Sequence, residues 1–387
     1  MLTRELDFDL PPELIAQTPI EPRDAARLLH FDRASGALSH RAVRELPQLL
    51  RAGDLLVFND TRVLRARLRG AKPSGGRVEA LLLKEHGVRG ADVWEALLKP
   101  SARLKVGGEL WFGEAELRVR AQLLERRDES WLLQFFPPPG QNLRDLLPVL
   151  GEVPLPPYIH AKTDEARYQT VFAREANTPH ALDSAAAPTA GLHFTPELLQ
   201  RLESRGIARA LVTLGVGVGT FRPVKAENLD DHAMHAEEFW ISDAVAAQIN
   251  AHKAAGGRIV AVGTTSVRAL EGAARNGKVQ AGAGETRLFL RPGAKFQIVD
   301  ALLTNFHLPR STLLALVAAF IEAGQNTKQN GQNSGLSRAS EGGNANGENS
   351  STTGSGGTGL ETTQRVYREA ISHRYRFFSF GDTMLIE

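Results

Sequence analysis

The sequence predicts a mixed α/β protein, in which a mostly parallel sheet domain carries an inserted small six-stranded β-barrel domain. Two observations predict it. Between about residues 63 and 150 short strand-like segments follow one another, with no convincing helix between them. After that stretch strands and helices alternate, which is typical of a largely parallel sheet covered by helices. We expect residues 1–60 and 153–387 to form the α/β domain and residues 61–152 to form the barrel.

Six segments carry the strand pattern of the barrel. Each is apolar or alternating, and each is bounded by turn-forming residues. They are Val63–Leu68, Val78–Leu83, Val93–Leu98, Glu109–Phe112, Glu116–Leu124 and Trp131–Phe136. The prolines at 137–139 and at 154, 156 and 157 mark the exit from the barrel, because proline cannot donate to a strand ladder.

The elements of the α/β domain follow these prolines. A Thr195-Pro196 start and Gly206 delimit the first helix, and Ser242 is the expected N-cap of another. Ser311 or Thr312 is expected to cap an apolar helix that ends near Ile321. The other expected helices and strands are Pro196–Arg205, Ala208–Leu214, Asp243–Ala255, Arg258–Val262, Ser266–Arg275, Arg365–His373, Arg376–Phe380 and Met384–Ile386.

A polar stretch interrupts the C-terminal part of this domain. From Gln325 to Leu360, 28 of 36 residues are Gly, Ser, Thr, Asn or Gln. Such a composition buries too little apolar surface to offset the entropy of ordering. We therefore expect residues 325–360 to be a disordered insertion.

Composition excludes several kinds of chemistry. The chain contains no cysteine, which excludes disulfides, thiolate nucleophiles, cysteine zinc sites and iron–sulfur clusters. With 46 basic and 44 acidic residues the formal charge is +2, so a nucleic-acid site would have to be a local patch. The charged N-terminal residues do not resemble a secretory signal, and the apolar run Leu313–Ile321 is too short to cross a bilayer. A cytoplasmic protein is expected.

The clearest candidate binding site is the sequence Gly263-Thr264-Thr265-Ser266, which joins an apolar strand to a helix. Free backbone N–H groups and hydroxyls at a helix start bind carboxylates or phosphates. Arg268 could add a guanidinium fork for a carboxylate. The alternative is that Thr265 or Ser266 only caps the helix.

Further candidates lie in polar turns. His232 and His235, followed by Glu237, have a spacing that could suit a metal, but no third histidine follows, so a substrate role and a surface turn are the main alternatives. The turns around His193 and His307 precede helices, as active-site donors or structural imidazoles do. The spacing of Gly217 and Gly219 is similar to that of a dinucleotide-binding motif, but the helix that such a motif needs is not expected after them. These glycines therefore indicate the close approach of a ligand or of another strand.

A run of positive charge marks the start of the predicted barrel. No acidic residue stands between Thr61 and Val78, and alternate arginines would share one face of a strand. The positions are Arg62, Arg65, Arg67, Arg69, Lys72 and Arg77. The pattern indicates phosphate contact, with a solvated strand face as the alternative.

Together these segments resemble the S-adenosylmethionine:tRNA ribosyltransferase-isomerase family of queuosine biosynthesis. The matching segments cover the chain end to end. They are Phe8–Leu29, Gly53–Arg67, Pro154–Ile159, Tyr168–Phe172, Ala186–Thr195, Val216–Val224, Asp231–Glu237, Val262–Glu271, Val299–Thr312 and Tyr375–Ile386. One departure is Gly215, where the family usually has a histidine.

The resemblance implies a reaction. The ribosyl part of S-adenosylmethionine is transferred to 7-aminomethyl-7-deazaguanine at the wobble position of tRNA and isomerised, which gives epoxyqueuosine and releases adenine and methionine. Adenosylmethionine is then a consumed co-substrate, with no metal or other cofactor expected. A monomer without an obligate protein partner or membrane is also expected. The alternatives are an adenosylmethionine-dependent RNA methyltransferase and a non-catalytic tRNA-binding module.

The resemblance also suggests roles for the candidate residues. The start of the helix at Gly263–Ser266, with Arg268, would hold the methionine carboxylate. The candidate acid and base groups are His193, His235 and His307, with Glu237 as the carboxylate alternative. Thr189, Asn305, Gly217 and Gly219 would line the substrate site, and the basic run from Arg62 to Arg77 would contact tRNA phosphates.

Overall fold

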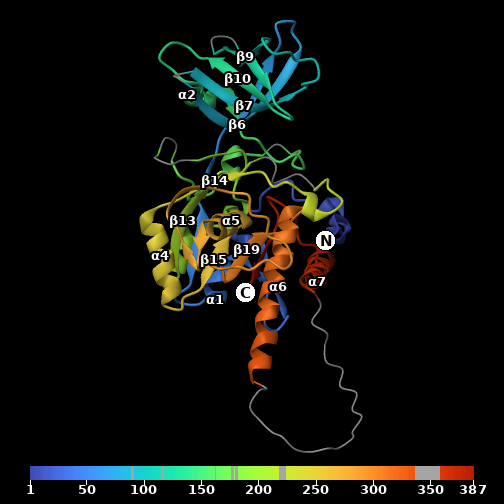
Figure 1. The fold of residues 1–387 in the computed structure, drawn as a ribbon, viewed down its shortest axis with the longest axis vertical. Helices are drawn as coiled ribbons and strands as arrows, with labels where there is room; N and C mark the ends of the chain where they lie inside the picture. The colour runs from blue at the N-terminus through green and yellow to red at the C-terminus, as the bar shows by residue number, and fades with distance from the viewer. Residues whose placement is uncertain are drawn as a thin grey trace, which may run out of the picture.

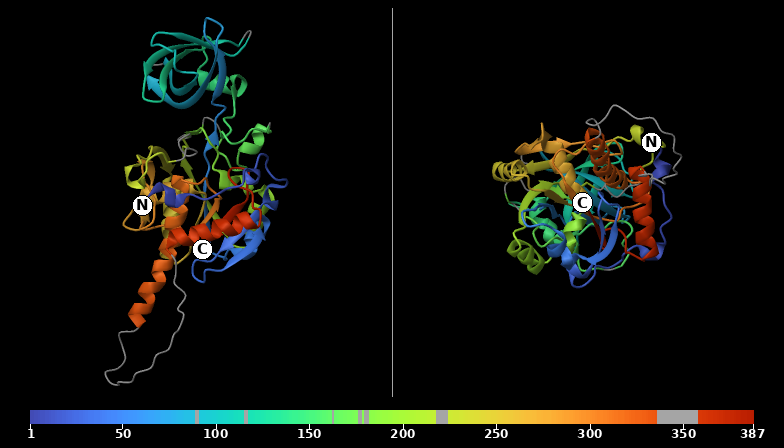
Figure 2. Two further views of the ribbon diagram at one scale, coloured as in Figure 1. Left: turned by 90° about the vertical axis from the view of Figure 1, so that its right-hand side faces the viewer. Right: turned by 90° about the horizontal axis from the view of Figure 1, so that it is seen from below.

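The computed structural model describes residues 1–387 except 89–90, 115–116, 162, 176–177, 179–181, 218–223 and 336–357. A β-barrel stands on one end of an α/β domain, and helix α6 extends from the opposite end (Figures 1 and 2). Both chain ends lie in the α/β domain (Figure 1). Within the described part of the chain, none of the helices has the length and hydropathy needed to cross a membrane.

A nine-stranded sheet forms the centre of the α/β domain, in the order β18-β14-β13-β3-β15-β19-β20-β1-β2. The adjacent central strands β13, β3, β15 and β19 are parallel, and β1 is parallel to β20. This mixed sheet confirms the predicted fold class. Its strands are β1 Arg27–Phe31, β2 Leu38–Ala42, β3 Leu55–Asn59, β13 Ala208–Leu214, β14 Glu237–Ile241, β15 Ile259–Val262, β18 Gly282–Thr286, β19 Ala301–Asn305 and β20 Thr383–Ile386.

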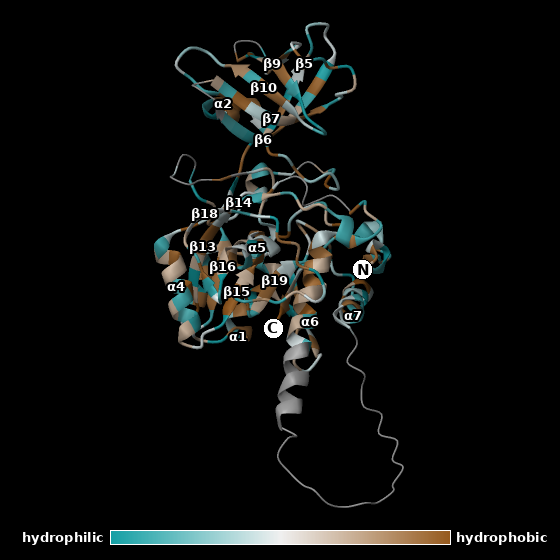
Figure 3. Ribbon diagram, in the orientation of Figure 1, coloured by the Kyte–Doolittle hydropathy of each residue, from teal (hydrophilic) through white to brown (hydrophobic). Residues whose placement is uncertain are grey.

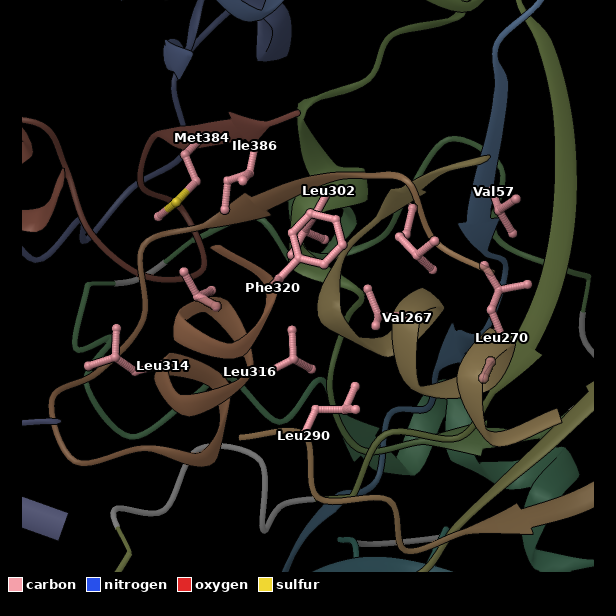
Figure 4. Close-up of a cluster of buried hydrophobic side chains, with 14 of the residues drawn as sticks. Val57, Val267, Leu270, Leu290, Leu302, Leu314, Leu316, Phe320, Met384 and Ile386 are labelled. Carbon is pink, nitrogen blue, oxygen red and sulfur yellow. The ribbon is translucent and has the colours of Figure 1, made fainter. Parts of the chain in front are cut away.

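Helices cover both faces of this sheet, because its central strands are apolar on both sides. The helices are α1 Leu46–Leu49, α3 Pro196–Ser204, α4 Asp243–Ala254, α5 Thr264–Ala273, α6 Thr312–Gly335 and α7 Gly359–Ser372. Val57 of β3 faces the cluster built with α4, α5, α6 and α7, part of which is shown in Figure 4. Its neighbours Leu56 and Phe58 face the cluster built with α1 and α3. Hydrophobic residues gather accordingly in the interior around β15 (Figure 3).

The second domain is a closed barrel of six antiparallel strands, as predicted. Its sheet runs β11-β5-β6-β7-β10-β9-β8, and the pairing of β5 with β8 closes it. Burial alternates along β10, as expected where one face fills the barrel interior. The six barrel strands are β5 Arg67–Ala71, β6 Arg77–Val88, β7 Ala91–Lys99, β8 Glu109–Phe112, β9 Val119–Arg126 and β10 Trp131–Phe136. The short β11 Gly151–Glu152 pairs with β5 at the edge.

The start of the barrel differs from the prediction. The expected strand Val63–Leu68 is divided, because Arg62–Val63 forms β4 and pairs with β12 (Asp183–Ser184) outside the barrel. The first barrel strand begins only at Arg67. Helix α2 (Leu143–Leu150) was not expected; its residue Asn142 caps it and its buried leucines pack into the barrel core.

Three further differences concern the C-terminal half. Helix α5 begins at Thr264, two residues before the predicted start. The segment Arg376–Phe380 is not a strand, although Phe377 forms an isolated bridge to Ile15. The predicted disordered insertion is shorter at both ends, because α6 continues to Gly335 and α7 begins at Gly359; its remainder, 336–357, lies outside the described residues. The small strands β16 Ala274–Arg275 and β17 Lys278–Val279 complete the fold.

Candidate functional site

Two cavities lie near the carboxyl ends of the parallel strands, where open α/β sheets bind ligands. The smaller, of about 50 Å³, is lined by Gly263–Thr265 at the start of α5 and by Thr304–His307 at the end of β19. The larger, of about 970 Å³, lies between the barrel and the α/β domain. Val216 lines both cavities. Residues from both domains line the larger cavity, and Val216 lies between it and the smaller one.

The start of α5 presents open donors to the smaller cavity. Gly263 is the N-cap residue with φ 89° and ψ 151°, a conformation that favours glycine, and no side chain caps the helix. The alternative in which Thr265 or Ser266 is the cap is therefore wrong. The Thr265 hydroxyl is buried and has no hydrogen-bond partner, whereas the Ser266 hydroxyl donates to the Val262 carbonyl. Thr265 is thus open to a ligand, and Ser266 is committed to the helix.

Arg268 makes a buried ion pair with Glu237. The Nη1 and Oε2 atoms are 2.6 Å apart, and the two side chains are 7% and 6% exposed. Burial lowers the pKa of Arg268, and Glu237 opposes that shift. Glu237 lines the larger cavity, whereas Arg268 lines neither cavity. In this structure Arg268 therefore contacts the cavity region through Glu237, while its Nε and Nη2 atoms are buried without a hydrogen-bond partner.

His193, Asn305 and Thr189 form a buried chain of hydrogen bonds. The Asn305 side-chain nitrogen donates to His193 Nε2 at 3.2 Å, and the Asn305 oxygen accepts from the Thr189 hydroxyl at 3.0 Å. His193 Nε2 is then the acceptor nitrogen of a neutral ring. Burial and two nearby arginines lower the pKa of His193 to about 3. Thr189 and Asn305 line the smaller cavity, and His193 supports them from behind.

His307 lines the smaller cavity and is also neutral. Its Nε2 lies 2.9 Å from the Thr304 hydroxyl, and its backbone N–H donates to the Tyr367 hydroxyl at 3.0 Å. Burial lowers the pKa of His307 to about 3. A ring whose pKa is this low is a weak proton acceptor, and at physiological pH it is a neutral hydrogen-bonding group. The same holds for His193.

The remaining predicted residues divide between the larger cavity and its surroundings. His235, exposed, lines that cavity together with Glu237 and Gly217. A Cβ at Gly217 would meet no atom within 4 Å, so packing against another strand does not account for this glycine. Gly219 lies outside the described residues. His232 packs edge-on against Phe289, in a segment that is not helical at His235.

The basic run does not form one arginine row. Arg65 precedes β5, and only Arg67 and Arg69 lie on that strand. Acidic residues from distant segments also pair with them: Arg65 with Glu165 at 3.2 Å, Arg67 with Glu79 at 3.6 Å and Arg69 with Glu152 at 2.7 Å. The basic run therefore contains no acidic residue in the sequence, but acidic side chains lie beside it in the folded structure. Arg62 and Arg65 line another cavity, of about 750 Å³, whereas Lys72 and Arg77 lie on the barrel, away from it.

Several site residues escaped the sequence-based reasoning. The cavity lined by Arg62 and Arg65 also receives Arg23, Arg144 and Arg174, which come from three separate parts of the chain. Lys84 of the barrel pairs with Glu238 of β14, across the larger cavity. Tyr158 and Ser379 line the smaller cavity and are hydrogen-bonded to each other at 2.7 Å. The segment Pro154–Ile159 was among those that resemble the family, but its prolines were interpreted only as the end of the barrel, so Tyr158 was not named as a site residue.

Comparison with known proteins identifies the family. The family model described as "Queuosine biosynthesis protein" matches residues 3–330 and 355–386. The chain belongs to this family. A protein of Anaeromyxobacter sp. (strain Fw109-5), named S-adenosylmethionine:tRNA ribosyltransferase-isomerase, is 46% identical over 389 residues, covering 100% of this chain and 99% of that protein. One of Symbiobacterium thermophilum with the same name is 46% identical over 389 residues and the full length of both.

A solved structure of the family has the same architecture. It is the crystal structure of S-adenosylmethionine tRNA ribosyltransferase from Thermotoga maritima, with a TM-score of 0.51 and 35% sequence identity. The match covers 99% of this chain and 100% of that one. The resemblance inferred from the motifs and the mixed sheet with an inserted barrel are both confirmed. The family match extends through both domains.

Proposed function

We propose that this chain is an S-adenosylmethionine:tRNA ribosyltransferase-isomerase. Full-length relatives of that name, 46% identical, carry the proposal. The substrate would be tRNA whose wobble base is 7-aminomethyl-7-deazaguanine, and adenosylmethionine would supply the ribosyl group. Adenine and methionine would leave, and epoxyqueuosine would remain on the tRNA. We further propose a cytoplasmic monomer that needs no metal or other cofactor for this reaction.

The start of α5 would hold the methionine carboxylate of adenosylmethionine. Backbone N–H groups of a helix start and the positive end of its dipole favour an anion. The unpartnered Thr265 hydroxyl adds one donor, and the cavity of about 50 Å³ has room for a group as small as a carboxylate. Arg268 would act indirectly, by orienting the carboxylate of Glu237.

Proton transfer would fall to His235 or Glu237. The sulfonium acidifies the neighbouring ribose C–H, so a base of moderate strength suffices. His193 and His307, whose pKa values burial lowers to about 3, would contribute hydrogen bonds instead. His235 and Glu237 both line the cavity of about 970 Å³, which is large enough for an extruded base and a nucleoside.

The anticodon arm would approach between the two domains. Arg62, Arg65 and Arg174 line one cavity there, and Lys84 lies at the other. Phosphate contacts of this kind position an RNA, while the pocket recognises the edges of the flipped base.

One incubation tests the proposal. The purified chain is mixed with adenosylmethionine and tRNA that carries the precursor base, and the small products are separated by chromatography. Free adenine, with none from tRNA that lacks the precursor, is the expected result. Release of S-adenosylhomocysteine would indicate methyl transfer, and tRNA binding without either product would indicate a non-catalytic module.

Single variants then assign the roles. His235→Ala and Glu237→Gln are expected to slow adenine release most, and His307→Gln least, since glutamine keeps a hydrogen bond to Thr304. Wild-type rates in both His235→Ala and Glu237→Gln would refute the assignment of proton transfer to these two groups.

A further inference from the structure

We propose that His40, Glu369 and His373 form a binding site for one divalent transition-metal ion, with Zn²⁺ as the best match. His40 lies on the edge strand β2, Glu369 near the end of α7, and His373 directly after α7. Their ligand atoms all lie within 4.8 Å of one another. None of the three lines the cavities described above. The site would be separate from the reaction.

The distances suit tetrahedral coordination. Glu369 Oε1 lies 3.3 Å from His40 Nε2 and 3.1 Å from His373 Nδ1. With metal–ligand bonds of about 2.0–2.1 Å, the ligand atoms of a tetrahedral zinc site lie about 3.3 Å apart. The two rings are tilted by 34° with their centroids 4.3 Å apart, so small rotations of these exposed side chains bring the nitrogens together. The exposed side leaves a position for water.

Hydrogen bonding orients His40 as a metal ligand. His40 Nδ1 lies 2.9 Å from the hydroxyl of the buried Tyr375, and His40 Nε2 lies 3.3 Å from Glu369 Oε1. When Nδ1 carries the ring proton and donates to the Tyr375 oxygen, the lone pair of Nε2 faces the carboxylate and is available to a metal ion. Ligating histidines characteristically have such a second hydrogen bond.

The chemical types of the three ligands favour one class of metal. His373 Nδ1 lies 3.1 Å from the Glu369 carbonyl oxygen and 3.2 Å from the Ser372 hydroxyl, so a proton on this nitrogen competes with the metal. Arg27 stacks on Tyr375 and adds a nearby positive charge. Two imidazoles and one carboxylate beside a cation suit Zn²⁺, Ni²⁺ or Cu²⁺, and not Mg²⁺ or Ca²⁺, which prefer several oxygens. A bound ion would tie α7 to the edge of the sheet.

Metal titration tests this proposal. The full-length chain without an affinity tag is stripped with a chelator and titrated with ZnCl₂ in a calorimeter and with CoCl₂ by visible absorption. We expect one ion per chain, a Tm that rises with Zn²⁺, and no such binding in His40→Ala or Glu369→Gln. Tyr375→Phe should weaken binding about tenfold, as loss of an outer hydrogen bond does. His86→Ala is the matched control, since His86 contacts Glu95 at 3.4 Å and belongs to no cluster of three ligands among the described residues.

The outcomes separate the metal site from a simple hydrogen-bonded cluster. Absence of stoichiometric Zn²⁺ binding by the wild-type chain overturns the proposal. So does binding that survives in both His40→Ala and Glu369→Gln, provided circular dichroism shows both variants folded. Loss of binding in these variants with retention in His86→Ala supports it, whatever the rate of adenine release.

Discussion

The buried pair Arg268–Glu237 offers the sharpest test of the site, through a double-mutant cycle. Arg268→Met removes the ion-pair partner of Glu237, whose side chain is 6% exposed, and Glu237→Gln removes the charge opposite Arg268, whose side chain is 7% exposed. Removing one partner of a buried ion pair costs about 3–5 kcal/mol, because the other charge stays desolvated. The double variant removes both charges, so its cost should be well below the sum of the two. We expect a coupling energy of about 3 kcal/mol.

Calorimetric unfolding of the four proteins measures this coupling through the transition of the α/β domain. Arg268→Lys, which keeps the charge but not the fork, should recover part of the stability lost in Arg268→Met. Adenine release adds an independent readout: if Arg268 acts by orienting Glu237, Arg268→Met lowers kcat in proportion to the loss in Glu237→Gln. Single-variant costs that add within about 0.5 kcal/mol would refute the coupling.

Other perturbations test the same geometry. Gly263→Ala forces an alanine to φ 89° at a cost of about 1–3 kcal/mol, and a higher KM for adenosylmethionine is expected; an unchanged KM would remove α5 from the site. Arg62→Glu with Arg65→Glu should weaken tRNA binding and lower its salt slope by about one per lost phosphate contact, whereas Arg69→Glu should change the slope less, because Arg69 does not line that cavity; equal slopes refute the cavity as an RNA contact. Native His307 has a pKa near 3 against 6.5 when unfolded, so the unfolded chain binds more protons between these pH values. The free energy of unfolding should therefore fall as the pH drops from 6.5 towards 3. Urea titrations at several pH values should show that this free energy depends less on pH in His307→Gln than in the wild-type chain.

Local signals in the sequence predicted the framework and the smaller cavity. The Thr195 and Ser242 caps lie where expected, because a side-chain oxygen before an apolar periodic segment is a local feature. Gly263 and Thr265 were found for a similar reason, since the strand, turn and helix follow one another directly. The start of α5 was placed too late because the glycine itself is the cap.

Long-range pairing explains what the sequence could not predict. The carboxylates that pair with Arg67 and Arg69 belong to residues 79 and 152, and no local pattern marks them as partners. The ion pair between Arg268 and Glu237 likewise joins a helix to a distant strand. The strand pattern over Val63–Leu68 was misleading, because its first residue pairs with β12 and not with the barrel. Only the folded arrangement separates these alternatives.

The position of the insertion explains why the barrel stands over the site. The chain leaves the sheet at the carboxyl end of β3, which lies between β13 and β15. These strands and β19 are parallel, so their carboxyl ends share one edge of the sheet. The smaller cavity opens at that edge, beside α5 and β19. A domain inserted there is attached beside the ligand-binding edge, and barrel residues such as Lys84 and Glu85 accordingly line the larger cavity.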